Sequence, residues 1–98
     1  MTDCDLLTML EYNLEIIADY MDQESRIQKE TELLFYINSA KEFIRREGIT
    51  LTDSVGDAQL IVMYSAWLYE RRKAPESNQG MPRMLRWNLN NRLFEEKI

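Results

Sequence analysis

Residues 60–97 read LIVMYSAWLYERRKAPESNQGMPRMLRWNLNNRLFEEK, and this stretch decides the fold. Its first part is an apolar run that ends in Arg71-Arg72-Lys73. A polar loop over residues 74–81 follows, rich in residues that interrupt helices. Pro82 then suits the first turn of another helix, because its missing N–H has no partner there. The stretch predicts two helices joined by a loop.

Working outward from this stretch, the spacing of apolar residues predicts four helices. They cover about residues 4–21, 25–47, 57–73 and 82–95. The third is apolar nearly all round, which predicts burial on more than one side and indicates a subunit interface as well as a core. The apolar faces of the other three are Leu6, Leu10, Leu14, Ile17 and Met21; Leu33, Ile37, Ala40 and Ile44; and Leu85, Leu89 and Leu93.

Several residues predict where these helices begin and end. Ser25 with Gln28 has the spacing of a capping box at the start of the second helix. Gly48 is placed to close that helix in a left-handed conformation. Ser54 or Asp57 is expected to cap the third helix. The connector between them, residues 48–56, carries two apolar residues that we expect to pack beneath the helices.

The fold class that these patterns predict is all-α, a small bundle of about four helices. Three Gly and two Pro are too few for the many tight turns of a β-sandwich or barrel. We expect residues 1–98 to form a single domain, with an acidic N-terminal helix in 1–25 and a core in 26–97. No apolar run approaches the roughly 20 residues of a membrane span, so no membrane contact is expected.

The composition gives no support to an enzyme. The chain contains no His, so the usual proton shuttle and the commonest metal ligand are missing. Cys4 stands alone, which excludes an internal disulfide and fits a reducing cytoplasm. No phosphate-binding glycine loop occurs. We therefore expect no catalytic residue, no metal and no cofactor.

The charges are distributed unevenly along a chain of formal net charge -5. Residues 1–25 hold seven acids and no base, whereas residues 71–92 hold six bases and one acid. Such polarity suits head-to-tail association between copies. It is equally compatible with pairing of the two ends inside one subunit. The sequence leaves both interpretations open.

Aromatic and arginine side chains gather in the last third of the chain. Tyr, Trp and Arg are the residues that most often dominate binding interfaces. Cations beside an aromatic are also typical of nucleic-acid binders, although the chain is acidic overall. A subunit or partner interface is favoured, and a small DNA-binding or regulatory protein is the alternative. The candidate residues are Tyr64, Trp67, Arg71, Arg72, Arg83, Arg86, Trp87 and Arg92.

An ordered set of motifs over about residues 26–97 resembles the head–tail connector (adaptor) family of tailed bacteriophages. The set begins with AKEFIRREG at 40–48 and continues with Asp57-Ala58, which opens an apolar helix ending in WLYERR at 67–72. It ends with MPRMLRWNLNNRLF at 81–94, the strongest part of the resemblance. The first 25 residues are longer and more acidic than the family's pattern.

This resemblance implies a structural virion protein at the head–tail interface, made in the bacterial host cytoplasm. Members assemble as a ring on the portal protein, extend the DNA channel and offer a surface to the next tail-side connector or stopper protein. Double-stranded DNA would pass through without specific contacts. An acidic channel wall would repel phosphate. The candidate channel-facing acids are Asp3, Asp5, Glu11 and Glu15.

Overall fold

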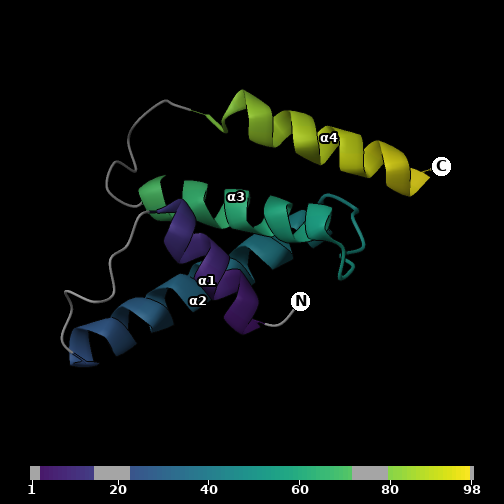
Figure 1. The fold of residues 1–98 in the computed structure, drawn as a ribbon. Helices are drawn as coiled ribbons and strands as arrows, with labels where there is room; N and C mark the ends of the chain where they lie inside the picture. The colour runs from purple at the N-terminus through teal and green to yellow at the C-terminus, as the bar shows by residue number, and fades with distance from the viewer. Residues whose placement is uncertain (1–2, 15–22, 72–79, 98) are drawn as a thin grey trace.

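The structure is a computed structural model that describes residues 3–14, 23–71 and 80–97. Within these ranges it contains four helices and no strand, so the predicted all-α bundle is confirmed. The helices are α1 (Asp3–Asn13), α2 (Gln23–Arg46), α3 (Val55–Arg71) and α4 (Arg83–Lys97). Figure 1 shows α3 between α4 on one side and α1 with α2 on the other.

Helix α3 is the centre of the hydrophobic core, because it contacts each of the other three helices. The predicted burial on more than one side is confirmed, since apolar residues all round α3 are covered from within the chain. Each fully buried Leu or Ile contributes about 1.5–3 kcal/mol through removal of its surface from water. The side chains that pack around α3 are Leu6 and Leu10 from α1, Leu33, Ile37, Ala40 and Ile44 from α2, and Leu85 and Leu89 from α4.

Two of the predicted helix ends are confirmed at the connector between α2 and α3. Gly48 has φ +100°, and its N–H donates to the Arg45 carbonyl at 3.0 Å, which ends α2. Ser54 caps α3, because its Oγ accepts the Asp57 N–H at 3.1 Å. Ile49 is buried and Leu51 half-buried, as expected for this connector.

Other predicted boundaries differ from the structure. Helix α2 begins at Gln23, so Ser25 is its third residue and the predicted capping box is wrong. Pro82 lies just before α4 rather than inside it, and its carbonyl accepts the first intrahelical bond from the Arg86 N–H at 3.0 Å. The expected extensions of the first and third helices, over 15–21 and 72–73, lie outside the described residues.

Replacement of Gly48 by Ala tests the left-handed end of α2. We expect Gly48→Ala to lower the free energy of unfolding by about 1–2 kcal/mol, because an L-residue resists φ +100°. The added Cβ would meet Leu93 only at an ordinary 3.4 Å, so the cost lies in the backbone. The measurement is urea unfolding followed by circular dichroism.

The matched control is Gly56→Ala in the first turn of α3, where an added Cβ meets nothing within 4 Å. This change should be neutral or stabilise the protein by about 0.4–1 kcal/mol. Equal effects of the two substitutions would contradict the assignment of Gly48.

Candidate functional site

The predicted interface residues of α3 form an aromatic cluster with α2 rather than a free surface. Tyr64 is buried, and its ring stacks on Phe43 with centroids 6.0 Å apart and planes 12° from parallel. Trp67 meets Tyr64 edge-on at 5.6 Å. The Arg71 guanidinium lies 5.2 Å from the centre of the Trp67 ring, a cation–π distance. Arg72 lies outside the described residues.

Two arginines of α4 are bound to acids within the same chain. Arg86 Nη1 lies 3.0 Å from Glu47 Oε2 and ties α4 to the end of α2. This pair is partly open to water, so its contribution is of the order of 0–1 kcal/mol. Arg92 is more enclosed and forms an ion pair with Asp57 of α3. By contrast Arg83, at the start of α4, is exposed.

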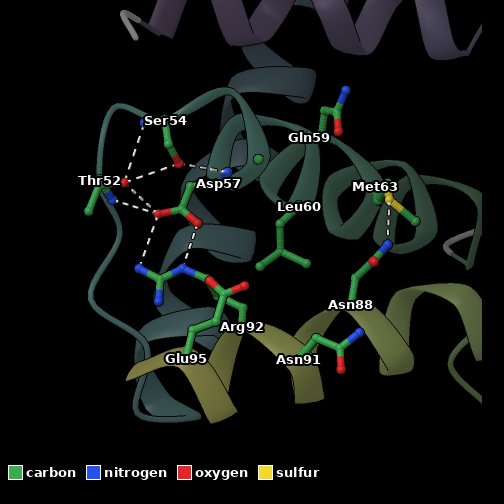
Figure 2. Close-up of a pocket in the computed structure, with 11 residues that line it drawn as sticks. Thr52, Ser54, Asp57, Gln59, Leu60, Met63, Asn88, Asn91, Arg92 and Glu95 are labelled. Atoms are coloured by element: carbon green, nitrogen blue, oxygen red, sulfur yellow. Dashed lines mark hydrogen bonds and ion pairs between the residues drawn. The ribbon is translucent and has the colours of Figure 1, made fainter. Parts of the chain in front are cut away.

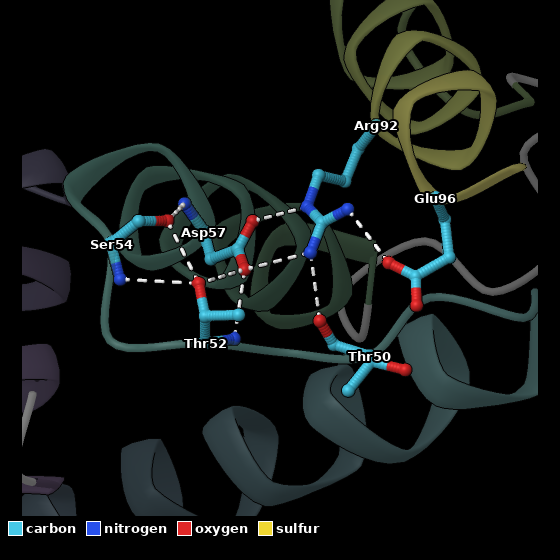
Figure 3. A network of polar contacts seen from close by, with 6 residues as sticks. All are labelled: Thr50, Thr52, Ser54, Asp57, Arg92 and Glu96. Atoms are coloured by element: carbon cyan, nitrogen blue, oxygen red, sulfur yellow. Dashed lines mark hydrogen bonds and ion pairs between the residues drawn. The ribbon is translucent and has the colours of Figure 1, made fainter. Parts of the chain in front are cut away.

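The Asp57–Arg92 pair is the centre of a polar network that joins α3, α4 and the connector (Figure 3). Arg92 Nε donates to Asp57 Oδ1 at 2.8 Å and its Nη2 to Asp57 Oδ2 at 3.3 Å. The same guanidinium donates to the Thr50 carbonyl at 2.8 Å and to Glu96 Oε2 at 2.9 Å. Thr52 donates to Asp57 Oδ2 from both its N–H and its hydroxyl, each at 2.8 Å.

This network keeps Asp57 ionised although its side chain is only 3% exposed. Burial acts to raise the pKa of Asp57, but the hydrogen bonds from Arg92 and Thr52 lower it, and the net pKa lies below its ordinary value. The hydrogen bond that Arg92 donates to Asp57 in turn raises the pKa of Arg92. A carboxylate that stays ionised does not exchange protons near neutral pH, so the role of Asp57 here is structural. We call the Asp57–Arg92 ion pair the clamp.

A polar groove of about 600 Å³ lies between α3 and α4 beside this clamp (Figure 2). Gln59, Asn88, Asn91 and Glu95 line it together with Leu60 and Met63, and Figure 2 places their side chains around the opening. These amides and carboxylates can bind a polar ligand by hydrogen bonding. Among the described residues, no group of three potential metal ligands occurs.

The outward face of α4 carries three exposed large apolar side chains. Met84, Trp87 and Phe94 are 62%, 62% and 67% exposed. Their spacing of three and seven residues places them on one face of α4, opposite the buried Leu85 and Leu89. We call these three residues the α4 stripe. Helix α4 therefore presents apolar side chains both to the core and to solvent.

The two candidate channel acids whose side chains the structure describes, Asp5 and Glu11, lie on different faces of α1. Asp5 is exposed on α1, and Asp3 belongs to the same helix. Glu11 is half-buried near Glu30 of α2, and burial together with that acid raises its pKa. Asp5 and Glu11 are separated by about 120° around the helix axis. Glu15 lies outside the described residues.

Sequence reasoning missed the role of Asp57 and the partners of Arg86 and Arg92. Asp57 was expected at most to cap α3, whereas the structure makes it the partner of a base 35 residues away. Glu47 and Arg86 are 39 residues apart. No local spacing signals such pairs, and the one sequence sign was an acid, Asp57, at the start of an apolar helix.

Comparison with protein-family models, with curated proteins and with solved structures found no match to this chain. Within the described residues, no helix combines the length and the apolar character needed to cross a membrane.

Replacement of Arg92 by Met tests the clamp. At neutral pH we expect Arg92→Met to cost about 3–5 kcal/mol of unfolding free energy, because it leaves a buried carboxylate without its cation. The matched control Arg83→Met, at an exposed position of the same helix, should change stability by no more than about 0.5 kcal/mol. Urea unfolding of all three proteins measures both effects.

The pH dependence of this cost follows from the lowered pKa of Asp57. In the wild type, the stability that this group contributes is present above its unfolded pKa of about 3.9 and is lost as the pH falls through the lower folded pKa. In Arg92→Met the unpaired carboxyl takes up a proton at higher pH. The difference in unfolding free energy between the wild type and Arg92→Met should therefore become smaller as the pH falls from 7 to about 4. If the difference in unfolding free energy stayed the same over this pH range, it would contradict the claim that Arg92 keeps Asp57 ionised.

Proposed function

We propose that this chain is a structural protein of a tailed bacteriophage, a head–tail connector (adaptor) rather than an enzyme. It docks on the portal protein as a ring, extends the DNA channel and joins the head to the tail-side connector or stopper protein. Its place is then the head–tail interface of the virion, after assembly in the host cytoplasm. The proposal draws on the motifs of residues 26–97 and on one structural observation.

That observation is the α4 stripe. The side chains of Met84, Trp87 and Phe94 are exposed to solvent. The opposite face of the same helix is already packed on the core. Exposed apolar residues in a contiguous set mark surfaces that other proteins cover, and Trp is the residue most enriched at the energetic centre of such contacts. A protein built to stack against neighbours needs a surface of this kind.

The pairing of the arginines favours protein contacts over the alternative of DNA binding. Affinity for nucleic acid scales with the number of phosphates that free cations neutralise. Arg86 and Arg92 are bound to Glu47 and Asp57, which leaves Arg71 and Arg83 as the exposed arginines among the described candidates. The pairing of Arg86 and Arg92 with acids thus reduces the positive charge that this part of the described chain offers to phosphate. A connector requires DNA to pass without sticking, so this reduction suits it.

Assembly with the cognate portal protein tests the proposal. Electron microscopy of the mixture should show a ring of added density on the portal. Trp87→Asp should abolish that density, because a carboxylate at a covered apolar position carries an uncompensated desolvation cost. Phe35→Asp, an equally exposed aromatic on α2, is the matched control and should assemble as the wild type does.

A protein that remains monomeric both alone and with the portal would contradict the proposal. Tight binding to duplex DNA that weakens steeply with salt would instead favour the DNA-binding alternative.

A further inference from the structure

A second apolar surface lies between α1 and α3, and its residues Gln59 and Met63 also border the polar groove beside α4. An open groove of about 510 Å³ runs between α1 and α3. We call it the α1–α3 groove. Tyr12 stands at its edge with 83% of its surface exposed, whereas Val62 is buried. The residues that line the groove are Thr8, Met9 and Tyr12 from α1 and Gln59, Val62 and Met63 from α3.

The volume of the α1–α3 groove is large enough for one of the side chains of the α4 stripe. Pockets of about 300–1,000 Å³ enclose ligands of drug size, so the α1–α3 groove has room for a Trp side chain. Trp87 projects from the outer face of α4, and Tyr12 is placed to meet an entering aromatic ring edge-on or offset-stacked. The two surfaces belong to different helices and share no residue. One chain can therefore use both at once, with two different neighbours.

The charges beside the two surfaces are opposite in sign. Asp5 lies one helical turn before Met9, on the groove side of α1, and residues 1–25 contain no Lys or Arg. Arg83 is exposed directly before Met84 at the start of the α4 stripe. Complementary charges of this kind guide two surfaces into register. They favour a second copy of this chain as the occupant of the groove, because the same chain carries Arg83 beside the stripe and Asp5 beside the groove.

We infer that the α4 stripe of one copy seats in the α1–α3 groove of the next copy. The inference rests on the proposed self-association and names its two faces. Because a stripe meets a groove rather than another stripe, the contact is heterologous, and it repeats until a ring closes or a filament grows.

The area buried in this contact indicates how strongly two copies would bind. Covering the α4 stripe buries about 300–500 Å² of one copy, since each of the three side chains is roughly two-thirds exposed. A stable interface buries about 800 Å² per partner. One contact alone is therefore weak. A closed ring gives every copy two contacts, and a portal that gathers copies raises their local concentration.

Disulfide trapping tests the inference. The cysteines are placed beside Trp87 and Tyr12, so that these two side chains remain unchanged. In a Cys4→Ser background, Thr8→Cys places a thiol in the α1–α3 groove. Asn91→Cys places one at the edge of the α4 stripe, four residues after Trp87 and three before Phe94, where the stripe borders the polar groove. Asn38→Cys on the exposed face of α2 is the matched control for random collision. Equal amounts of two variants are mixed with oxidised glutathione, and covalent dimers are followed on non-reducing gels.

We name each covalent dimer by the two positions that its disulfide joins. The 8–91 dimer should form on the order of tenfold faster than the 38–91 dimer, because the complex holds the thiols at positions 8 and 91 near each other. Adding Trp87→Ala to the Asn91→Cys chain should remove that advantage, whereas adding Phe35→Ala should not. A chain that carries both Thr8→Cys and Asn91→Cys should give a ladder of covalent oligomers.

An 8–91 rate equal to the 38–91 rate would overturn the inference. So would faster formation of a 91–91 dimer, which would mean that two stripes pair face to face. Either result can occur while wild-type rings still form on the portal, so failure of this contact is distinguishable from failure of the proposed connector function.

Discussion

The structure depends on the burial of α3 from several sides at once. An apolar helix in water is stable only if other helices cover it, and α1, α2 and α4 each contact it. Helix α4 is held there by Leu85 and Leu89 against the core and by two ion pairs, Arg92 with Asp57 and Arg86 with Glu47. Because that attachment uses one face of α4, its opposite face is left to solvent.

The clamp between Asp57 and Arg92 illustrates how a buried pair can specify an arrangement. Buried ion pairs in general add little net stability over apolar residues of similar size, but removal of one partner is costly. Here the carboxylate also accepts two hydrogen bonds from Thr52, so its charge fixes the connector, the start of α3 and the end of α4 together. We infer that the clamp sets the orientation in which α4 presents its stripe.

The buried helix faces and the helix ends could be predicted from the sequence, because they depend on residues that are close together in the chain. The apolar steps of α2 placed Leu33, Ile37, Ala40 and Ile44 on the buried face, and each has no exposed surface. Gly48 and Ser54 marked helix ends through local backbone chemistry. The capping box at Ser25 failed because helix α2 begins two residues earlier.

Long-range pairing could not be predicted in this way. The charge asymmetry between the two ends of the chain suggested that the basic end meets the first 25 residues, either within a subunit or between copies. Arg86 and Arg92 instead pair with Glu47 and Asp57, acids from the middle of the chain. The groove between α1 and α3 likewise arises from packing, since Met9 and Met63 are 54 positions apart. A fold of this class hosts many functions, so the function has to be argued from these surfaces.

Tryptophan fluorescence measures most directly whether the outward face of α4 is covered on assembly. Trp67→Phe leaves Trp87 as the single reporter, and Trp87→Phe leaves the half-buried Trp67 as its control. On assembly with the portal, Trp87 emission should shift to shorter wavelength and become shielded from iodide, while Trp67 changes little. An assembled ring in which Trp87 remains as red-shifted and as quenchable as in the free protein would contradict the account.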